Sequence, residues 1–551
     1  MVSCPICETQ NHSRYLNRTR QYIFILVALT VFLFFWKLGS LTFVDEDEAM
    51  YAQVAQEMLN RGDWVYPHLN GVYWVDKPPL VPWAIAISFK TLGRNEFSIR
   101  LWHSVVALMG VLITYLVGKQ LFGEKAGFFS GLILASSLQY FYQARITLCD
   151  IPLTFFITLS LYLFLLLVKS RNPFFFYLSI ISMAAATLSK GPVGAVLPVS
   201  VIILYLIFVR EKLFEKKFLF HILMGAGLFL CIVGPWFYLQ VLRYGKEFIQ
   251  RYFFYKHFAR FIHPIDVPVS TTKPDPFYSY FFIILAGFLP WSGVMLQGTG
   301  SLIKKLLKER KPEEVFTLIW AGVIFLFFSI AGMKVPRYIM PIYPALAIIS
   351  GRFFLQSEDS QSGTPEKDRR WLSFLLSFIL APFLLLIVIF AKRHFESDVL
   401  LYLPVLKPSL IILGAGMGIG SILFFLPDRR IVFVSFLIAG VLSYSSLIFY
   451  SNRYFNHLRV SKRFAGVINK LLKPEDRIVD YRPPNPEPSL IFYTNHPVDF
   501  IGDEDTLTSL LRSGTRVFCV VPGIQLPALK EKIKIQILDE TAGRALVVNR
   551  L

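Results

Sequence analysis

The chain has 551 residues, of which 54% are hydrophobic and 16% aromatic, and its mean hydropathy is +0.53. This composition excludes a soluble globular protein, because apolar runs of membrane-spanning length have no place in a water-exposed fold. The net charge of +19 suggests a nucleic-acid partner, but the basic residues fall mostly in short loops between apolar segments, where they face anionic headgroups. We therefore expect a polytopic membrane protein in contact with lipids, and no nucleic acid.

Residues 1–21 form a hydrophilic segment ahead of the first apolar run, YIFILVALTVFLFFW at residues 22–36. No small-residue cleavage site follows, so we expect a signal anchor with a cytoplasmic N-terminus. Cys4 and Cys7 supply only two of the four ligands that a structural zinc site needs, and no second pair stands at suitable spacing.

Apolar segments that are long enough to cross a hydrocarbon core recur throughout residues 22–450, the predicted transmembrane domain. Lys or Arg residues occupy every second loop, which by the positive-inside rule predicts an inside N-terminus and an outside C-terminus. About thirteen spans are predicted from the length requirement: residues 22–38, 99–118, 126–144, 151–168, 174–189, 192–209, 218–242, 277–297, 314–332, 336–355, 371–391, 408–426 and 431–450.

Two of the predicted outer loops are long, residues 39–98 and residues 243–276. The first contains AMYAQVAQEMLNRG, whose apolar spacing predicts a helix along the membrane surface that ends at Gly62. The second contains RYFFYKHFARFIHP, a basic and aromatic stretch that suits either the membrane interface or substrate contact. Irregular backbone near membrane depth is tolerated where it lines a cavity, so we expect both loops to roof a cavity open to the outer leaflet.

Hydropathy falls after residue 451, and residues 455–551 are predicted to form a small soluble α/β domain on the outer side. RIVDY, LIFYT, RVFCVV and ALVVNR are its predicted strands, and residues 504–513 and 527–534 are its predicted helices. The domain contains no catalytic motif. The predicted fold class is thus an α-helical polytopic membrane protein with a small C-terminal α/β domain.

Acidic side chains gather at the predicted outer boundary of the membrane. Asp45, Glu46, Asp47 and Glu48 follow the first span, and Asp150 occupies a matching position before another apolar run. Charged groups at such a boundary are costly unless they pair, bind a cation or take part in chemistry. Two acidic sites at the same face therefore suggest a metal or general-base centre.

Several motifs follow one another between residues 20 and 355. The first outer loop contains D-E-x-x-Y-A, G-D-W, L-N-G and D-K-P-P, and later motifs are ARITLCDIPLTFF, LSKGPVGAVLP, GFLPWSG and FSIAGMKVPRYIMPIYPAL. Together they resemble the aminoarabinose transferases, bacterial members of the protein-O-mannosyltransferase-like, C-type glycosyltransferase superfamily. One departure is Met50, where those enzymes often have Arg before the motif's Tyr. It loosens the match to that particular sugar and leaves the general chemistry intact.

The resemblance implies an inverting glycosyltransferase of the bacterial inner membrane, which moves a sugar from a polyprenyl-phosphate-linked donor to an outer-leaflet or periplasmic acceptor. The most specific reaction that the resemblance implies is transfer of aminoarabinose to lipid A of lipopolysaccharide. Other sugars and glycan or protein acceptors are the alternatives. The departing phosphate needs neutralisation by a divalent cation or by Lys and Arg. The rival class is a transporter or flippase for lipid-linked sugars, but transporters commonly show inverted repeats and midplane charges, which are not apparent here.

The resemblance also implies roles for particular residues. Asp47 is the expected general base or acceptor-orienting carboxylate, and Asp150 is its electrostatic or metal-binding partner. Asp76 is a further expected oxygen ligand for a divalent metal cation of unspecified identity. The expected substrate-binding residues are Glu48, Tyr51, Lys77, Lys190, Lys334 and Arg337.

These assignments have structural alternatives, and for Asp47 and Glu48 the alternative is a solvated acidic run. Asp150 stands just before Pro152, where an Asp often caps a helix. Lys77 precedes two prolines and can instead extend toward the membrane interface. Lys334 either binds the donor phosphate together with Lys190 and Arg337, through the charge-assisted hydrogen bonds that Lys and Arg form, or anchors the end of a helix.

Overall fold

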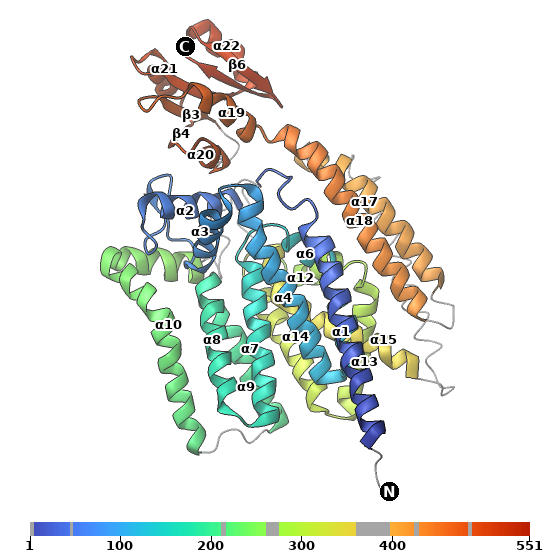
Figure 1. Cartoon of the computed structure of the whole chain (residues 1–551). Helices are drawn as coiled ribbons and strands as arrows, with labels where there is room; N and C mark the ends of the chain where they lie inside the picture. The colour runs from blue at the N-terminus through green and yellow to red at the C-terminus, as the bar shows by residue number, and fades with distance from the viewer. Residues whose placement is uncertain are drawn as a thin grey trace. The chain divides into compact units, whose positions relative to one another are not determined.

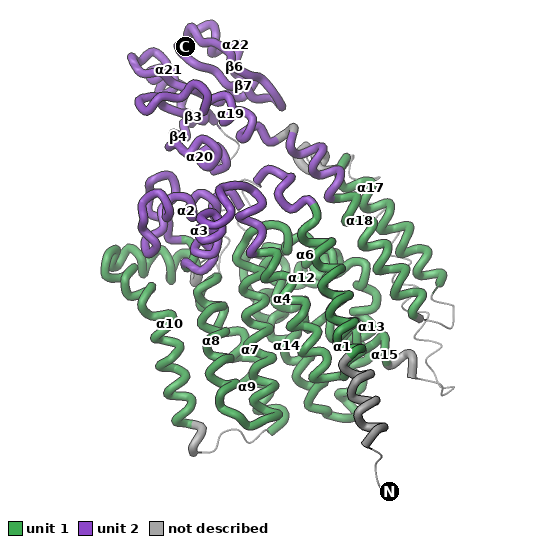
Figure 2. Tube along the Cα trace, in the orientation of Figure 1, with its two compact units in different colours: residues 1–36, 76–78, 103–447 green, residues 37–75, 79–102, 448–551 purple. Residues whose placement is uncertain are grey.

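The computed structural model describes residues 5–43, 48–210, 216–259, 275–359, 397–423, 429–482 and 488–550. The chain divides into two compact units, which are coloured separately in Figure 2. Unit 1 comprises residues 1–36, 76–78 and 103–447, and unit 2 comprises residues 37–75, 79–102 and 448–551. The short stretch 76–78 thus belongs to unit 1, although its chain neighbours on both sides belong to unit 2.

Unit 1 is built from helices, as the apolar runs predicted (Figure 1). Within the described parts of the chain, nine helical stretches are long and apolar enough to cross a membrane. The chain is therefore a multi-pass membrane protein. The helices wholly or mostly in unit 1 are α1 (Pro5–Phe35), α4 (Glu96–Phe122), α5 (Glu124–Ala135), α6 (Leu138–Gln143), α7 (Asp150–Ser170), α8 (Pro173–Lys190), α9 (Val193–Val209), α10 (Lys216–Phe248), η1 (Ile249–Ala259), α12 (Ser279–Gly287), α13 (Ser292–Lys308), α14 (Pro312–Ile330), η2 (Pro336–Ile342), α15 (Tyr343–Asp359), α17 (Ser397–Leu423) and α18 (Arg429–Leu458).

Two of the predicted spans are interrupted. The span predicted at residues 126–144 consists of α5 and α6, and Ser137 between them has an extended backbone, with φ −80° and ψ 135°. The span predicted at residues 277–297 consists of α12 and α13, separated by a turn that contains Pro290. A proline has no backbone N–H to continue the helical ladder, so the helix stops there. The predicted span 371–391 lies outside the described residues.

The hairpin of α7 and α8 is joined by only two residues, Arg171 and Asn172. Arg171 is left-handed, with φ 57°, and its N–H closes α7 by donating to Leu167 O at 2.8 Å. The Asn172 side chain caps α8 by accepting from the N–H of Phe174 at 2.9 Å. A connection this short makes the two helices antiparallel neighbours, so the start of α7 and the end of α8 lie at the same end of the hairpin (Figure 1).

Small and hydroxylated residues bring the helices of this region close together. Ser160 of α7 and Ser179 of α8 share a hydrogen bond of 2.9 Å, and Ser182 donates to Phe156 O at 2.7 Å. Where α8 meets α9, a Cβ atom added to Gly194 of α9 would lie 2.4 Å from the backbone of Ala186 in α8. Such small residues let helix backbones approach where lipid offers no hydrophobic driving force.

The loop part of unit 2 contains α2 (Glu48–Arg61), β1 (His68–Leu69), β2 (Val72–Tyr73) and α3 (Leu80–Leu92). The predicted helix is confirmed as α2, and Gly62 follows it with φ 67°. The helix is buried on most sides from Glu48 to Met58, and its position along the membrane surface stays a prediction. Its alanines are small enough for α3 and the C-terminal helix α20 (Pro488–Thr494) to pack against it.

The C-terminal part of unit 2 is an α/β domain with a five-stranded sheet of order β4-β3-β5-β7-β6. The strands β4, β3 and β5 are parallel, and β7 and β6 pair antiparallel. A buried apolar cluster covers each face of the sheet. The elements of the domain are α19 (Ser461–Leu471), β3 (Arg477–Tyr481), α20, β4 (Val498–Ile501), α21 (Glu504–Arg512), β5 (Val517–Pro522), η3 (Gly523–Gln525), α22 (Leu526–Lys532), β6 (Gln536–Thr541) and β7 (Arg544–Val548).

Most predicted elements of this domain are confirmed, namely β3, β5, β7, α21 and α22. The strand predicted at LIFYT is wrong, because these residues form the end of helix α20. A short apolar run that is buried all round fits a helix as well as a strand. The prediction also missed β4 and β6, which carry Asp499 and Asp539 among their apolar residues.

Candidate functional site

The ends of α7 and α8 bring together Asp150 and Lys190, both predicted from the sequence. Asp150 begins α7, Lys190 ends α8, and the Lys190 ammonium donates to Asp150 Oδ1. Asp150 lies at the positive N-terminal end of the α7 dipole, and Lys190 lies at the negative C-terminal end of the α8 dipole, so each helix stabilises its charge. Asp150 is 1% exposed, so this is a buried ion pair. The helix-cap alternative for Asp150 is wrong, since Cys149 holds the capping position of α7.

A second cation, Arg337, approaches Asp150 from η2. Its Nε lies 3.7 Å from Asp150 Oδ2, and 28% of the Arg337 side chain is exposed, against 10% for Lys190. The next residue, Tyr338, places its ring 4.1 Å from Lys190 Nζ and 5.8 Å from the Arg337 guanidinium. Cations are attracted to the face of an aromatic ring. Tyr338 therefore holds both cations beside the same carboxylate.

Asp76 and Lys77, from the D-K-P-P motif, lie in the part of the first outer loop that belongs to unit 1. Lys77 Nζ lies 2.9 Å from Asp76 Oδ2, and Lys256 Nζ of η1 lies 3.6 Å from Asp76 Oδ1. Burial lowers the pKa of Lys77, but the charge of Asp76 and a hydrogen bond to it oppose this effect, and the net pKa is raised. Lys77 is therefore charged at neutral pH. It lies near Cys149 and Tyr338, which are the chain neighbours of Asp150 and Arg337.

These side chains form a group in which cations outnumber carboxylates. We call Asp76, Lys77, Asp150, Lys190, Lys256 and Arg337 the cation cluster. Its four cations face two carboxylates, which leaves an excess of two positive charges. A surplus of Lys and Arg in a partly buried site attracts anions, and phosphate oxygens accept their charge-assisted hydrogen bonds.

The metal-binding role predicted for Asp76 and Asp150 does not fit their surroundings. Among the residues that the structure describes, no three His, Cys, Asp or Glu side chains gather as metal ligands do. Each of the two carboxylates faces two cations, whereas carboxylates converge on a bound divalent cation. The metal stays a prediction, and no step below depends on it.

Glu48 and Tyr51, two predicted substrate-binding residues, are buried in unit 2. Glu48 accepts from Arg100 Nε at 2.7 Å and from Arg100 Nη2 at 2.5 Å. Arg100 also donates to backbone carbonyls in the segment 38–42. The Tyr51 ring packs edge-on against Trp74 with centroids 5.7 Å apart. Both side chains thus hold unit 2 together, and a contact with substrate stays a prediction.

Lys334 lies at the end of α14. Its side-chain ammonium donates to Ala331 O, and its backbone N–H donates to Asp275 Oδ2 at 2.8 Å. Burial lowers the pKa of Lys334, and Asp275 opposes this shift without cancelling it. These contacts favour the alternative in which Lys334 anchors the helix end.

The predicted catalytic residue Asp47 lies outside the described residues, together with Asp45 and Glu46. The residues next to this stretch, Phe43 and Glu48, are described and belong to unit 2.

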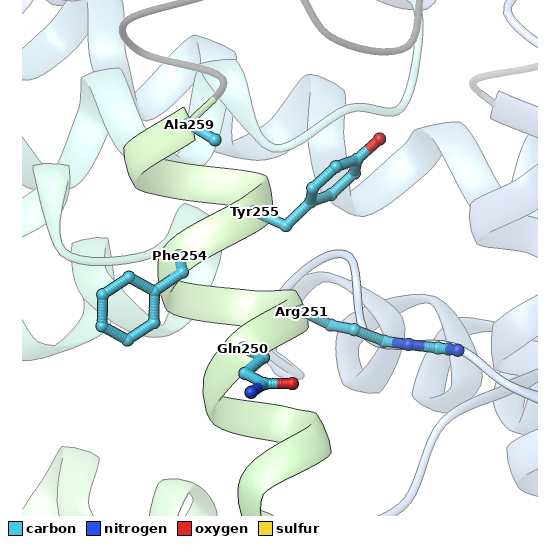
Figure 3. A pocket seen from close by; sticks show the side chains of 5 residues that line it. All are labelled: Gln250, Arg251, Phe254, Tyr255 and Ala259. Carbon is cyan, nitrogen blue, oxygen red and sulfur yellow. The ribbon is translucent and has the colours of Figure 1, made fainter.

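A hollow of about 490 Å³ runs beside η1 (Figure 3). Its lining residues all come from this one segment and are Gln250, Arg251, Phe254, Tyr255 and Ala259. Figure 3 shows Phe254 pointing away from Arg251 and Tyr255. None of the predicted site residues lines this hollow, so the cavity expected beneath the outer loops stays a prediction.

Three residues of these arrangements were not assigned a role from the sequence. Lys256 was weighed only as part of an aromatic loop, and Tyr338 only as part of a motif. Arg100 offered the clearest signal, because it lies inside the apolar span predicted at 99–118. An ionisable residue within such a span needs a partner, and here that partner is Glu48.

Known proteins resemble this chain in sequence and in fold. The family model of dolichyl-phosphate-mannose-protein mannosyltransferases matches residues 76–238, a stretch that includes Asp76, Lys77, Asp150 and Lys190. An uncharacterized protein of Aquifex aeolicus (strain VF5) is 34% identical over 336 residues, which cover 61% of this chain and 64% of that protein.

A named relative is the undecaprenyl phosphate-alpha-4-amino-4-deoxy-L-arabinose arabinosyl transferase 2 of Proteus mirabilis (strain HI4320). It is 28% identical over 344 residues, which cover 61% of this chain and 60% of that protein. The matched region thus spans less than two thirds of the length of these two relatives.

The fold also has a counterpart among solved structures. The crystal structure of ArnT from Cupriavidus metallidurans bound to undecaprenyl phosphate superposes with a TM-score of 0.78 at 23% identity, covering 96% of this chain and 98% of that one. The motifs, the family model and the fold agree. Over residues 76–238 the chain is similar to the dolichyl-phosphate-mannose-protein mannosyltransferases, and its fold is similar to that of ArnT.

Proposed function

We propose that this protein is an inverting membrane glycosyltransferase that moves a sugar from a polyprenyl-phosphate donor to an acceptor at the outer face of the inner membrane. In its most specific form, the donor is aminoarabinose linked to undecaprenyl phosphate and the acceptor is lipid A. The name of the Proteus mirabilis relative and the fold shared with ArnT support this proposal.

The excess positive charge of the cation cluster carries the proposal. A polyprenyl-phosphate sugar is a phosphodiester, and its phosphate becomes a monoester when the sugar leaves. A phosphate monoester carries about −1.5 to −2 charges at neutral pH, which the two excess positive charges of the cluster can balance. Fixed cations aimed at a charge that grows during the reaction stabilise the transition state more than the ground state.

The proposed step is a single displacement at the anomeric carbon. An acceptor oxygen forms a bond to this carbon from the face opposite the phosphate, the carbon–oxygen bond to the phosphate breaks, and polyprenyl phosphate leaves with the electron pair. If the acceptor is a hydroxyl, its proton passes to Asp47 as general base. An ionised phosphate acceptor on lipid A has no proton to transfer.

Within this step, the cluster residues have distinct tasks. Arg337 is the most exposed of its cations and is proposed to bind the departing phosphate together with Lys77. Asp150 keeps the Lys190 and Arg337 side chains in place through its two oxygens. Without that carboxylate, the two cations would repel each other and their geometry would be lost.

The proposal includes an orientation in the membrane. The basic inner loops favour a cytoplasmic N-terminus and a periplasmic C-terminal domain. A reporter that is active only in the periplasm, fused to the C-terminus, should give a signal, and the same reporter at the N-terminus should give none.

The deciding experiment is sugar transfer in proteoliposomes with a panel of polyprenyl-phosphate sugars and lipid A. Wild type is compared with Asp47→Ala and Asp150→Ala, and Asp539→Asn serves as control because Asp539 forms an exposed ion pair with Arg463 in unit 2. We expect transfer by wild type and the control and almost none by the other two variants.

Transfer that survives both Asp47→Ala and Asp150→Ala would remove these carboxylates from the reaction. Movement of labelled donor between leaflets, without sugar reaching any acceptor, would replace the proposed transferase by a transporter.

A further inference from the structure

Arg337 lies in the first turn of η2, a short 3₁₀ helix. The Tyr338 N–H closes this turn by donating to Val335 O at 2.9 Å, and the ring of Pro336 fixes the backbone φ just ahead of Arg337. The hydrogen bonds of a 3₁₀ helix have poorer geometry than those of an α-helix, so such a segment is weakly stable by itself. Contacts from outside η2 must therefore hold Arg337 where it faces Asp150.

Two buried side chains from other helices supply these contacts. Tyr280 of α12 donates its hydroxyl to Val335 O at 3.0 Å, and the Gln139 amide of α6 donates to Pro336 O. Tyr280 is 0% exposed and Gln139 is 8% exposed, so water hardly competes for either bond. Both backbone carbonyls immediately ahead of Arg337 are thus held by side chains that do not belong to η2.

The Gln139 amide can take only one orientation. A backbone carbonyl only accepts hydrogen bonds, so the amide nitrogen must face Pro336 O. The amide oxygen then accepts from the hydroxyl of Tyr343, the residue that follows η2. Gly287 of α12 leaves room for this pair, because an added Cβ atom would clash with the Tyr343 hydroxyl and with the Gln139 oxygen. Gln139 therefore joins the two ends of η2.

The supporting helices α6 and α12 belong to the two interrupted spans, and the interruptions hold each other. The Leu138 N–H donates to Leu289 O at 3.0 Å. The Trp291 indole donates to Ser136 Oγ at 3.0 Å, and the Tyr444 hydroxyl of α18 donates to Ser136 O at 2.8 Å. Backbone groups at helix ends lack partners within their own helix, and here each interruption supplies some of them to the other. The result is that α6, α12 and η2 pack against one another.

We propose that Gln139 and Tyr280 are the positioning residues of Arg337, and that the two interrupted spans place them for this task. The proposal rests on the proposed function, in which Arg337 binds the departing phosphate. Loss of either hydrogen bond should let η2 shift, which moves the Arg337 guanidinium relative to Asp150 and Lys190 and weakens its hold on phosphate. Neither positioning side chain binds the phosphate, so each acts through Arg337.

The test compares two chemically identical changes. Tyr280→Phe removes the hydroxyl that holds η2. Tyr140→Phe is the matched control, because Tyr140 is a buried tyrosine of α6 whose hydroxyl also donates to a backbone carbonyl, Ala107 O of α4, at 2.8 Å. We expect Tyr280→Phe and Gln139→Leu each to raise the Kd for undecaprenyl phosphate about fivefold, the effect of one hydrogen bond, and Tyr140→Phe to leave it within about twofold. Titration calorimetry separates a raised Kd from the lowered stoichiometry that a loss of folded protein alone would give.

A double-mutant cycle shows whether the positioning residues act through Arg337. In protein that already carries Arg337→Gln, the further change Tyr280→Phe should alter the Kd less than about twofold, because the guanidinium that the hydroxyl positions is gone. An equal effect of Tyr280→Phe in both backgrounds would overturn the proposal. A wild-type Kd in both Tyr280→Phe and Gln139→Leu, or an equal rise in Tyr140→Phe, would overturn it as well.

Amide hydrogen exchange across residues 335–342 provides a readout that needs neither ligand nor transfer. Exchange should be faster in Tyr280→Phe than in Tyr140→Phe, because the first turn of η2 opens more often, and equal exchange refutes the positioning. If the wild type binds undecaprenyl phosphate and transfers no sugar, the proposed function fails and the Kd values still decide the positioning. If the wild type binds no undecaprenyl phosphate, the proposed phosphate site fails and exchange alone decides.

Discussion

Three ion pairs of unit 2 differ from the cation cluster of unit 1 in how their charges are matched. In unit 2, three buried carboxylates each pair closely with one arginine: Glu48 with Arg100, Asp476 with Arg516, and Asp480 with Arg544. In unit 1, four cations share Asp76 and Asp150, and two of the distances are long, 3.6 Å to Lys256 and 3.7 Å to Arg337.

The difference separates ion pairs that hold a fold together from charges that are available to a ligand. A close one-to-one pair satisfies both partners, and adding an anion would disturb it. An excess of cations repels itself and becomes more stable when an anion enters. The charge balance of a cluster, more than its burial, therefore points to the functional site.

The strongest test of this comparison replaces one carboxylate in each unit. Asp150→Asn should lower kcat/KM for sugar transfer roughly 100-fold or more, because the cations that face the phosphate lose their alignment. Asp480→Asn should reduce the yield of folded protein and leave kcat/KM per folded molecule within about twofold, since Asp480 only supports the sheet. Transfer rates normalised to monodisperse protein measure both. Equal losses of kcat/KM would end the distinction between the units.

A second test removes one arginine from each unit. Arg337→Gln should weaken binding of undecaprenyl phosphate about tenfold, the size of one charge-assisted contact, and Arg337→Lys should recover part of the affinity. The counterpart Arg516→Gln in unit 2 should leave this affinity unchanged. Titration calorimetry in detergent provides the dissociation constants. Unchanged binding in Arg337→Gln would remove Arg337 from the phosphate site.

A third test uses pH on a pair of unit 2. Burial raises the pKa of Asp476, but hydrogen bonds from Arg516 and from the Lys473 N–H outweigh it, and the net pKa is lowered. A lowered pKa in the folded state stabilises the fold above the unfolded value of about 3.9, and the stabilisation disappears as pH falls through the folded pKa.

Asp476→Asn should therefore speed amide exchange in β3 about fivefold at pH 7 and at pH 5, which corresponds to about 1 kcal/mol. The ratio of variant to wild-type exchange should approach one once the pH is below the folded pKa of Asp476. A ratio that does not change with pH would mean that the carboxylate charge is not what stabilises β3.

The smallest expected effect concerns metal removal. Since Lys and Arg face the two carboxylates of the cation cluster, chelation with EDTA should change the transfer rate less than about twofold. A large loss that added Mg²⁺ or Zn²⁺ restores would return Asp76 and Asp150 to the role of metal ligands. Asp480→Asn, assayed in parallel, controls for effects of the chelator on folding.

Sequence reasoning predicted the helical architecture well, because long apolar runs leave few alternatives. It also selected Asp76, Lys77, Asp150, Lys190 and Arg337, all of which the structure brings into the cation cluster. It did not pair Asp150 with Lys190. That pairing depends on the two-residue turn that makes α7 and α8 antiparallel, which the separate predictions for the two spans did not use.

The less successful predictions share a physical cause. The helix at residues 490–494 and the burial of Glu48 in α2 both depend on contacts between residues far apart in the chain. Glu48 is the clearest example, because the motif around it suggested substrate contact, whereas its partner Arg100 lies 52 residues away. Local composition does not reveal such a partner.

The packing of α20 against α2 has a consequence for biosynthesis. Helix α2 ends at Arg61 and α20 begins at Pro488, so the ribosome completes most of the chain before the first outer loop can meet the helix that holds it. Domains fold as their residues emerge, and here an early loop must wait for the last domain. Truncated products of translation would lack the assembled loop, which ties the emergence of activity to completion of the polypeptide.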